Sequence, residues 1–213
     1  MNEFEEALLS YYSPEQLSVI QKVKVGIAGT GGLGSNTAVC LARSGFMDFE
    51  IIDPDAVEMK NLNRQHYFLS DIGRPKVEAL SKRLKKINPD ITVKTGTIYL
   101  SRKNIMNYFN DRDVIFEAFD NVESKSLLLE SFGNSHKLLI FGNGLAGISN
   151  QSEIKIKKIR ENIFIVGDGV TCVGPKTPPL APRVTACAAM MASCALEQIL
   201  SNGGRLNRSI GNI

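Results

Sequence analysis

The chain has 213 residues, 43% of them apolar and 22% charged, which is enough for one sizeable α/β domain that folds without disulfides. Its formal net charge is only +3 and its basic residues are scattered, apart from KKIR at 157–160, so we expect no nucleic-acid partner. The four cysteines include no CxxC pair, and neither a disulfide framework nor a four-thiolate zinc site is indicated.

The N-terminal stretch MNEFEEALLS is acidic, unlike the basic start of a secretory or transit peptide. The most apolar segment, between Arg183 and Glu197, has thirteen residues, whereas a bilayer span needs about 20. We therefore expect a soluble, cytoplasmic protein with no membrane partner.

The first part of the chain predicts a helix followed by a strand–helix–strand unit. Apolar residues at helical spacing indicate an amphipathic helix within 1–22. The run KVKVGIAG (22–29) is rich in Val and Ile and predicts a buried strand. Residues 35–44 predict a helix, and FEIIDPD predicts a second strand that ends at Asp53.

The alternation then repeats. We expect helices at 75–87, 102–109 and 122–132, and strands at 91–98, 113–120 and 137–143. This pattern predicts an α/β fold with a Rossmann-like, mostly parallel sheet and helices on both faces.

After Gly147 the pattern changes. SEIKIKKI (152–159) and NIFIVGD (162–168) alternate apolar and polar residues and predict an antiparallel hairpin that extends the sheet. A loop rich in glycine and proline covers 167–182, and a buried helix follows at 184–200.

Gly29, Gly31 and Gly34 have GxGxxG spacing between the first strand and its helix. Such a turn places unpaired N–H groups of a helix N-terminus next to an anion. Asp53 ends the next strand, where a carboxylate can accept hydrogen bonds from ribose hydroxyls. Up to this point NAD and ATP fit equally well.

The residues after Asp53 favour phosphate chemistry over a nicotinamide. Asn61, Asn63, Arg64 and Gln65 form a polar cluster beyond the carboxyl end of a strand, where ligands of such sheets bind. Arg64 can bind phosphate oxygens in a bidentate manner, and Lys76 can supply a point charge. Asp120 ends the strand at 113–120 and is placed to hold Mg²⁺.

The stretches GTGGLGSN, DPDAVEMKNLNRQ, GRPKVEAL, INPDITV and FDNVESK together resemble the ThiF/MoeB/HesA family, relatives of the ubiquitin-activating enzymes. The resemblance covers about 23–141, and the ending TPPLAPRVTACAAMMASCALE is similar to that of a short second branch of ThiF. It implies a single adenylating domain over 1–213, with a helical segment (1–22), a nucleotide-binding core (23–145) and a C-terminal part (146–213). It also implies an enzyme, commonly a homodimer, that adenylates the C-terminal glycine of a ubiquitin-like sulfur carrier, ThiS, for thiamine biosynthesis and releases pyrophosphate.

The resemblance implies a role for each matching residue. Asp53 would bind the ribose of ATP, and Asp120 would organise Mg²⁺ and the reacting phosphate. The glycines would leave room for the nucleotide and the Gly-Gly tail of the carrier. The implied catalytic residues are Arg64, Lys76 and Asp120, and the implied nucleotide-binding residues are Gly29, Gly31, Gly32, Gly34, Asp53, Asn61, Arg64, Gln65, Lys76 and Asn121.

The sequence also departs from the family. Longer members carry an arginine near the N-terminus, but here none precedes Arg43, and without CxxC pairs zinc is not expected. Some relatives use a cysteine in the crossing loop, and Cys172 in GDGVTCVGP is a possible reactive thiol. His66 and His136 are expected to be structural or surface residues, because the attacking carboxylate is already ionised and needs no general base.

Three functions stay open at this point. The first is adenylation of the sulfur carrier, which we expect to dock on the hairpin at 152–166. The second is activation of another carboxylate, on a MoaD-like carrier or a modified tRNA base. The third is a non-catalytic subunit that binds a nucleotide, against which the joint presence of Arg64, Lys76 and Asp120 argues.

Overall fold

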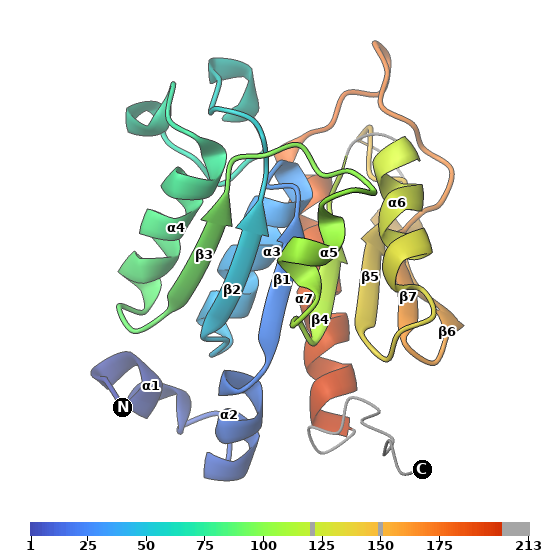
Figure 1. Ribbon diagram of the computed structural model, residues 1–213. Helices are drawn as coiled ribbons and strands as arrows, with labels where there is room; N and C mark the ends of the chain where they lie inside the picture. The colour runs from blue at the N-terminus through green and yellow to red at the C-terminus, as the bar shows by residue number, and fades with distance from the viewer. Residues whose placement is uncertain (120–121, 149–150, 202–213) are drawn as a thin grey trace.

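The computed structural model describes residues 1–119, 122–148 and 151–201, and seven strands form one sheet in this part of the chain (Figure 1). Their order across the sheet is β3-β2-β1-β4-β5-β7-β6. The strands are β1 (Lys24–Ala28), β2 (Asp48–Ile52), β3 (Thr92–Gly96), β4 (Val114–Glu117), β5 (Leu138–Gly142), β6 (Lys155–Arg160) and β7 (Ile163–Gly167). All neighbours pair in parallel except β6 and β7, so the predicted fold class is confirmed.

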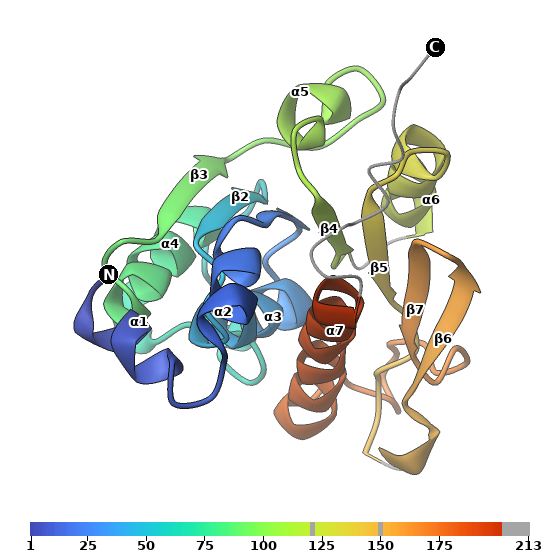
Figure 2. The same cartoon turned by 90° about the horizontal axis from the view of Figure 1, so that it is seen from below.

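Helices cover both faces of the sheet, as Figure 2 shows in a view from below. The α-helices are α1 (Glu3–Leu8), α2 (Pro14–Gln21), α3 (Gly32–Arg43), α4 (Lys76–Ile87), α5 (Ile105–Phe109), α6 (Val122–Phe132) and α7 (Ala181–Ser201). Short 3-10 turns, η1 (Met59–Asn61), η2 (Leu69–Asp71) and η3 (Gln151–Glu153), lie in the connections. Helices α3, α4 and α7 pack on one face and α5 and α6 on the other.

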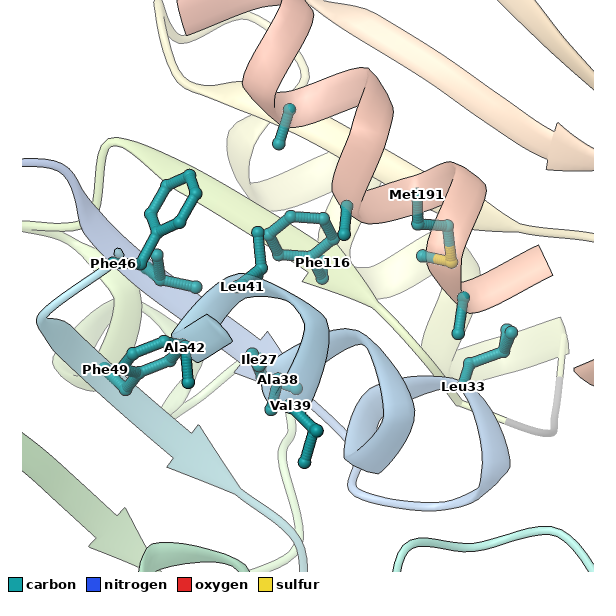
Figure 3. Close-up of a cluster of buried hydrophobic side chains, with 14 of the residues drawn as sticks. Ile27, Leu33, Ala38, Val39, Leu41, Ala42, Phe46, Phe49, Phe116 and Met191 are labelled. Atoms are coloured by element: carbon teal, nitrogen blue, oxygen red, sulfur yellow. The ribbon is translucent and has the colours of Figure 1, made fainter. Parts of the chain in front are cut away.

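The larger core lies between the sheet and the α3–α7 layer (Figure 3). Ile27 from β1 and Phe116 from β4 are fully buried in this core, where Phe116 lies next to Leu41 of α3 and Ile27 next to Ala38. Leu33 and Met191 meet over the end of β5, where a Cβ on Gly142 would lie 2.2 Å from Leu33 Cδ1. Through this contact the first turn of α3 and the middle of α7 pack together at the carboxyl edge of the sheet.

Helix α7 (Ala181–Ser201) begins three residues before the helix predicted at 184–200 and is longer than the segment of thirteen apolar residues within it. It has 21 residues and, within the described residues, is the one helix long and apolar enough to cross a bilayer by length and composition. Cys187, Ala188 and Met191 on this helix are fully buried in the core next to α3. Its contacts are therefore those of a core helix.

The N-terminal segment forms two helices instead of the single helix predicted. Ser13 accepts a hydrogen bond from the Gln16 N–H, and the Gln16 side chain accepts one from the Ser13 N–H. This reciprocal cap, with Pro14 at the first helical position, starts a new helix at that point. The strand predicted at 91–98 is also shorter: β3 covers Thr92–Gly96, which pair with the five residues of β2.

Candidate functional site

A cavity of about 700 Å³ opens at the carboxyl edge of the sheet. It lies beyond β1 and β4, where the connecting helices change from one face to the other and ligands of doubly wound sheets bind. Its lining comprises Gly29, Gly31–Leu33, Ile52–Asp55, Arg64, Gln65, Lys76, Ile98–Leu100, Ala118, Phe119, Lys125, Gly142–Leu145, Thr171–Val173, Pro179 and Val184. We call the part from Gly29 to Lys76 the β1–β2 wall, and the part from Lys125 to Val184 the β5–β7 wall.

The glycine turn shapes the β1–β2 wall by close backbone contact. Gly29 has a φ of +92°, and a Cβ there would lie 2.9 Å from the Ala118 carbonyl oxygen. A Cβ on Gly34 would lie 1.9 Å from the Gly29 carbonyl oxygen. Gly31 is the N-cap of α3 and makes no side-chain cap, so the first N–H groups of this helix face the cavity without a side-chain acceptor.

Asp53 lies in the floor of the cavity and is only 5% exposed. Its Oδ2 accepts a hydrogen bond from the Thr30 N–H at 2.6 Å, and its Oδ1 accepts one from the Asp55 N–H at 2.9 Å. Two backbone donors thus fix the carboxylate in place. A carboxylate held in this way can still accept hydrogen bonds from hydroxyl groups of a ligand.

Lys76 begins α4 and reaches the same floor. Its side chain is 7% exposed, and its Nζ lies 2.7 Å from Asp55 Oδ2 and 4.0 Å from Asp53 Oδ1. The Lys76 N–H also donates to the Asp55 carbonyl oxygen at 2.9 Å. Asp55, which the sequence analysis did not single out, therefore holds the lysine at the cavity.

Arg64 and Gln65 line the cavity next to the glycine turn. Asn63 Oδ1 accepts a hydrogen bond from Arg64 Nη1 at 2.8 Å, and Asn36 Nδ2 donates to the Arg64 carbonyl oxygen at 2.8 Å. Gln65 is 7% exposed, and its Oε1 has no hydrogen-bond partner within the described residues. Such a buried polar atom is suited to a ligand donor.

Asn61 is not among the described residues that line the cavity, although the resemblance implied that it binds the nucleotide. It is buried, and its Oδ1 accepts a hydrogen bond from the Glu58 N–H at 2.9 Å. Its carbonyl oxygen accepts from the N–H groups of Arg64 and Gln65. In this structure Asn61 therefore positions Arg64 and Gln65 from behind.

Asp120 and Asn121, predicted to organise Mg²⁺ and the reacting phosphate, lie outside the described residues. Within the described residues, no group of three or more His, Cys, Asp and Glu side chains could hold a metal ion. The role of Asp120 in binding Mg²⁺ accordingly stays a prediction.

The β5–β7 wall carries an ion pair with a buried carboxylate, which the sequence analysis missed. Lys125, in the first turn of α6, donates from Nζ to Glu117 Oε2 and to the Gly142 carbonyl oxygen, each at 2.7 Å. The side chain of Glu117 is completely buried, and its Oε1 accepts from the Phe119 N–H at 2.7 Å. The sequence offered one sign of this pair, a glutamate at the end of the otherwise apolar strand β4.

A second buried pair, Asp168 with Arg183, ties the crossing loop to α7. Their side chains are 3% and 1% exposed. Asp168 also accepts hydrogen bonds from the N–H groups of Val170 and Thr171 and from the Thr171 hydroxyl. Burial by itself raises the pKa of Asp168, but these hydrogen bonds and the one from Arg183 lower it to about 2.

The same loop is fitted closely against the end of β5. Gly144 has a φ of +77°, and a Cβ there would lie 2.0 Å from Asp168 Oδ1. The Asp168 N–H donates to the Gly144 carbonyl oxygen at 3.0 Å. As a result, Thr171 and Cys172 lie along the cavity, and Cys172 is an exposed free thiol there.

Neither histidine lines the cavity within the described residues. The His66 N–H donates to Ser35 Oγ, and burial together with the charges of Arg83 and Arg43 lowers the pKa of the imidazole. His136 is exposed. The opposite end of the cavity is apolar, with Ile52, Ile98 and Leu100 among its lining residues.

The profile of the ThiF family matches residues 5–206. The chain belongs to the ThiF family. It is 32% identical over 154 residues to the tRNA threonylcarbamoyladenosine dehydratase of Haemophilus influenzae, covering 71% of this chain and 59% of that protein. It is 26% identical over 217 residues to the sulfur carrier protein adenylyltransferase of Thermus thermophilus, covering 93% of this chain and 77% of that family member.

A solved structure of a related fold holds a nucleotide. The tRNA N6-threonylcarbamoyladenosine dehydratase of E. coli in complex with ATP superposes with a TM-score of 0.85 and 22% identity, covering 95% of this chain and 96% of that one. The likeness confirms the fold. It leaves the activity of this family member to be proposed from its own site.

Proposed function

We propose that the chain is an ATP-dependent adenylyltransferase, a single domain over 1–213 that converts a carboxylate into an acyl-adenylate and releases pyrophosphate. One observation carries the proposal: the buried carboxylate of Asp53 and the cations Arg64 and Lys76 line one cavity together with the N-terminus of α3. The carboxylate of Asp53 suits ribose hydroxyls, and the two cations and the helix N-terminus suit phosphates. A non-catalytic nucleotide-binding subunit would not need both cations.

We propose one orientation of ATP in the cavity. The apolar end at Ile52, Ile98 and Leu100 suits the base, and Asp53 follows at the ribose. The phosphates would then lie against the α3 N-terminus, Arg64, Gln65 and Lys76. The E. coli relative whose structure contains ATP has the same fold, which supports this choice of nucleotide.

The chemistry requires no general base. A substrate carboxylate is ionised at neutral pH, because its pKa is about 3.5. One of its oxygens attacks the α-phosphorus, and the bond to the bridging oxygen breaks, so pyrophosphate leaves with that electron pair. Arg64 and Lys76 stabilise the negative charge that moves onto the phosphates. When bound, Mg²⁺ would add positive charge there, and Asp120 is the residue we propose to hold it.

The substrate we propose is the C-terminal glycine of a ubiquitin-like sulfur carrier of the ThiS type, as in thiamine biosynthesis. The T. thermophilus relative is named for a sulfur carrier protein. The end of β5 offers two glycines, Gly142 and Gly144, along the path of a thin tail. The exposed edge strand β6, with Lys155 and Lys157, is the surface on which we propose the carrier docks.

A second candidate substrate is a modified base in tRNA. The dehydratases of H. influenzae and E. coli are named for threonylcarbamoyladenosine, a nucleoside whose threonyl group carries a carboxylate. The same adenylation step would serve that carboxylate. We rank it second because the formal net charge of the chain is only +3, which does not favour binding to the phosphates of a nucleic acid.

One experiment separates these substrates. The chain is incubated with ATP labelled at the α-phosphate and with either a ThiS-type carrier ending in Gly-Gly, the same carrier without its last glycine, or tRNA carrying threonylcarbamoyladenosine. Only with the intact carrier do we expect the labelled AMP group to be transferred to the carrier as an acyl-adenylate, with release of unlabelled pyrophosphate. Product with tRNA alone would select the second candidate.

A further inference from the structure

The Lys125–Glu117 pair brings a cation to the side of the cavity opposite Lys76. Lys125 extends from α6, next to β5, whereas Lys76 begins α4, next to β3 (Figure 1). Both side chains line the same cavity. Positive charge therefore faces a ligand from both walls.

Glu117 fixes the position of this cation. Its side chain has no solvent exposure, so its ionised carboxylate needs a partner charge within the protein. Lys125 provides that charge at 2.7 Å and is further held by the Gly142 carbonyl oxygen at 2.7 Å. Movement of the lysine away from this place would remove the positive charge that the buried carboxylate of Glu117 contacts.

The ammonium group nevertheless keeps one donor for a ligand. An ammonium has three N–H groups, and Lys125 uses two of them on Glu117 and Gly142. No acceptor for the third lies among the residues that the structure describes. The side chain is 27% exposed and lines the cavity, so this donor can meet a bound molecule.

We propose that Lys125 is a further catalytic residue, which donates to the substrate carboxylate and holds it for attack on ATP. The inference rests on the proposed function. One carboxylate oxygen forms the new bond to the α-phosphorus while pyrophosphate leaves, and the other becomes the carbonyl oxygen of the acyl-adenylate. Lys125 binds this second oxygen, in the carboxylate and in the product, and transfers no proton.

Lys125 and Lys76 thus have separate tasks. Lys76 lies beside Asp53 and acts on the nucleotide, whereas Lys125 contacts Gly142, on the path proposed for the acyl group. Glu117 is a positioning residue that acts through Lys125. Loss of Lys125 should accordingly affect binding of an acyl-adenylate and leave binding of AMP unchanged.

The test uses the double variant Lys125→Met/Glu117→Gln, in which no buried charge is left unpaired, so that the fold is retained. Binding of AMP and of a glycyl-glycyl sulfamoyl adenosine, a stable mimic of the acyl-adenylate, is measured by calorimetry. We expect AMP to bind as in the unmodified protein and the mimic to bind about 10- to 100-fold more weakly, as for loss of a charged hydrogen bond. Lys125→Arg should recover most of the affinity for the mimic.

Turnover provides the second readout. Carrier-dependent pyrophosphate exchange should lose kcat in the double variant, with the KM for ATP unchanged, and Glu117→Gln alone should lose less because the lysine remains. Equal affinity for the mimic in the unmodified and double-variant proteins would overturn the inference and show that the pair is only structural. If the unmodified protein itself bound the mimic no better than AMP, the proposed function would fail before any variant was made.

Discussion

The two walls of the cavity are built by different physical means. The β1–β2 wall depends on backbone shape, since Gly29 and Gly34 let β1, β4 and α3 approach within distances that no Cβ allows. The β5–β7 wall depends on buried charge, through the pairs Lys125–Glu117 and Asp168–Arg183. A wall shaped by backbone contacts depends little on side chains and suits a ligand that relatives share. A wall held by side-chain pairs can change with single substitutions and suits ligands that differ between relatives.

The largest effect should come from breaking a charge pair in the β5–β7 wall. Arg183→Met leaves Asp168 buried without its partner and should lower the free energy of unfolding by about 4 kcal/mol. The matched double variant Arg183→Met/Asp168→Asn removes both charges and should recover most of that loss. The free energies of unfolding of the unmodified protein and the two variants are measured by chemical denaturation. A double variant as unstable as Arg183→Met would show that the unpaired charge of Asp168 is not the cause of the loss.

In the β1–β2 wall, Lys76→Ala should remove catalysis and keep the fold. Loss of one preorganised cation at the phosphates should lower the rate of pyrophosphate exchange by about 100-fold or more. Lys82→Ala, an exposed lysine on the same helix, is the control and should retain full activity. Exchange at the normal rate in Lys76→Ala would refute the assignment of this residue.

The glycines of the same wall offer a matched pair. Gly34→Ala would place a methyl group 1.9 Å from the Gly29 carbonyl oxygen and should cost about 3 kcal/mol of stability as the turn is forced open. Gly31→Ala has no atom nearer than Gln65 Nε2 at 3.8 Å and should cost little stability. The Tm values of both variants are measured by thermal unfolding. Equal values would show that the close contact at Gly34 does not determine stability.

The smallest effect should appear as a dependence on pH. Because the pKa of Asp168 falls to about 2 in the folded protein, below its ordinary value of 3.8, its contribution to stability is complete above about pH 4. The contribution is lost as the pH falls through about 2. The difference in Tm between the unmodified protein and Asp168→Asn should therefore shrink over this range, and a constant difference would contradict the shift.

The fold and the β1–β2 wall could be predicted from sequence because their signals are local. Gly29, Asp53 and Lys76 each follow a strand or begin a helix, so topology alone brings them to one edge. The position of Asn61 could not be predicted in this way. Its side-chain amide accepts a hydrogen bond from the Glu58 N–H at the start of η1 and does not line the cavity. The break between α1 and α2 was also missed, although Ser13 and Pro14 signal it.

The β5–β7 wall could not be predicted in the same way. Arg183 and Lys125 resemble ordinary surface residues in the sequence, and only packing shows that their partners are buried. The fit of Gly144 against Asp168 joins segments 24 residues apart. The available signals were weak: a glutamate at the end of an apolar strand and an arginine in an apolar helix.

The most direct test of the central claim is exchange of labelled pyrophosphate into ATP in the presence of Mg²⁺. It is run with a ThiS-type carrier that ends in Gly-Gly and with the same carrier lacking its last glycine. The account predicts exchange with the intact carrier and none with the shortened one, because the terminal carboxylate must reach the cavity between the two walls. Measurable ATP binding without exchange for either the carrier or the tRNA substrate would contradict adenylation by this chain.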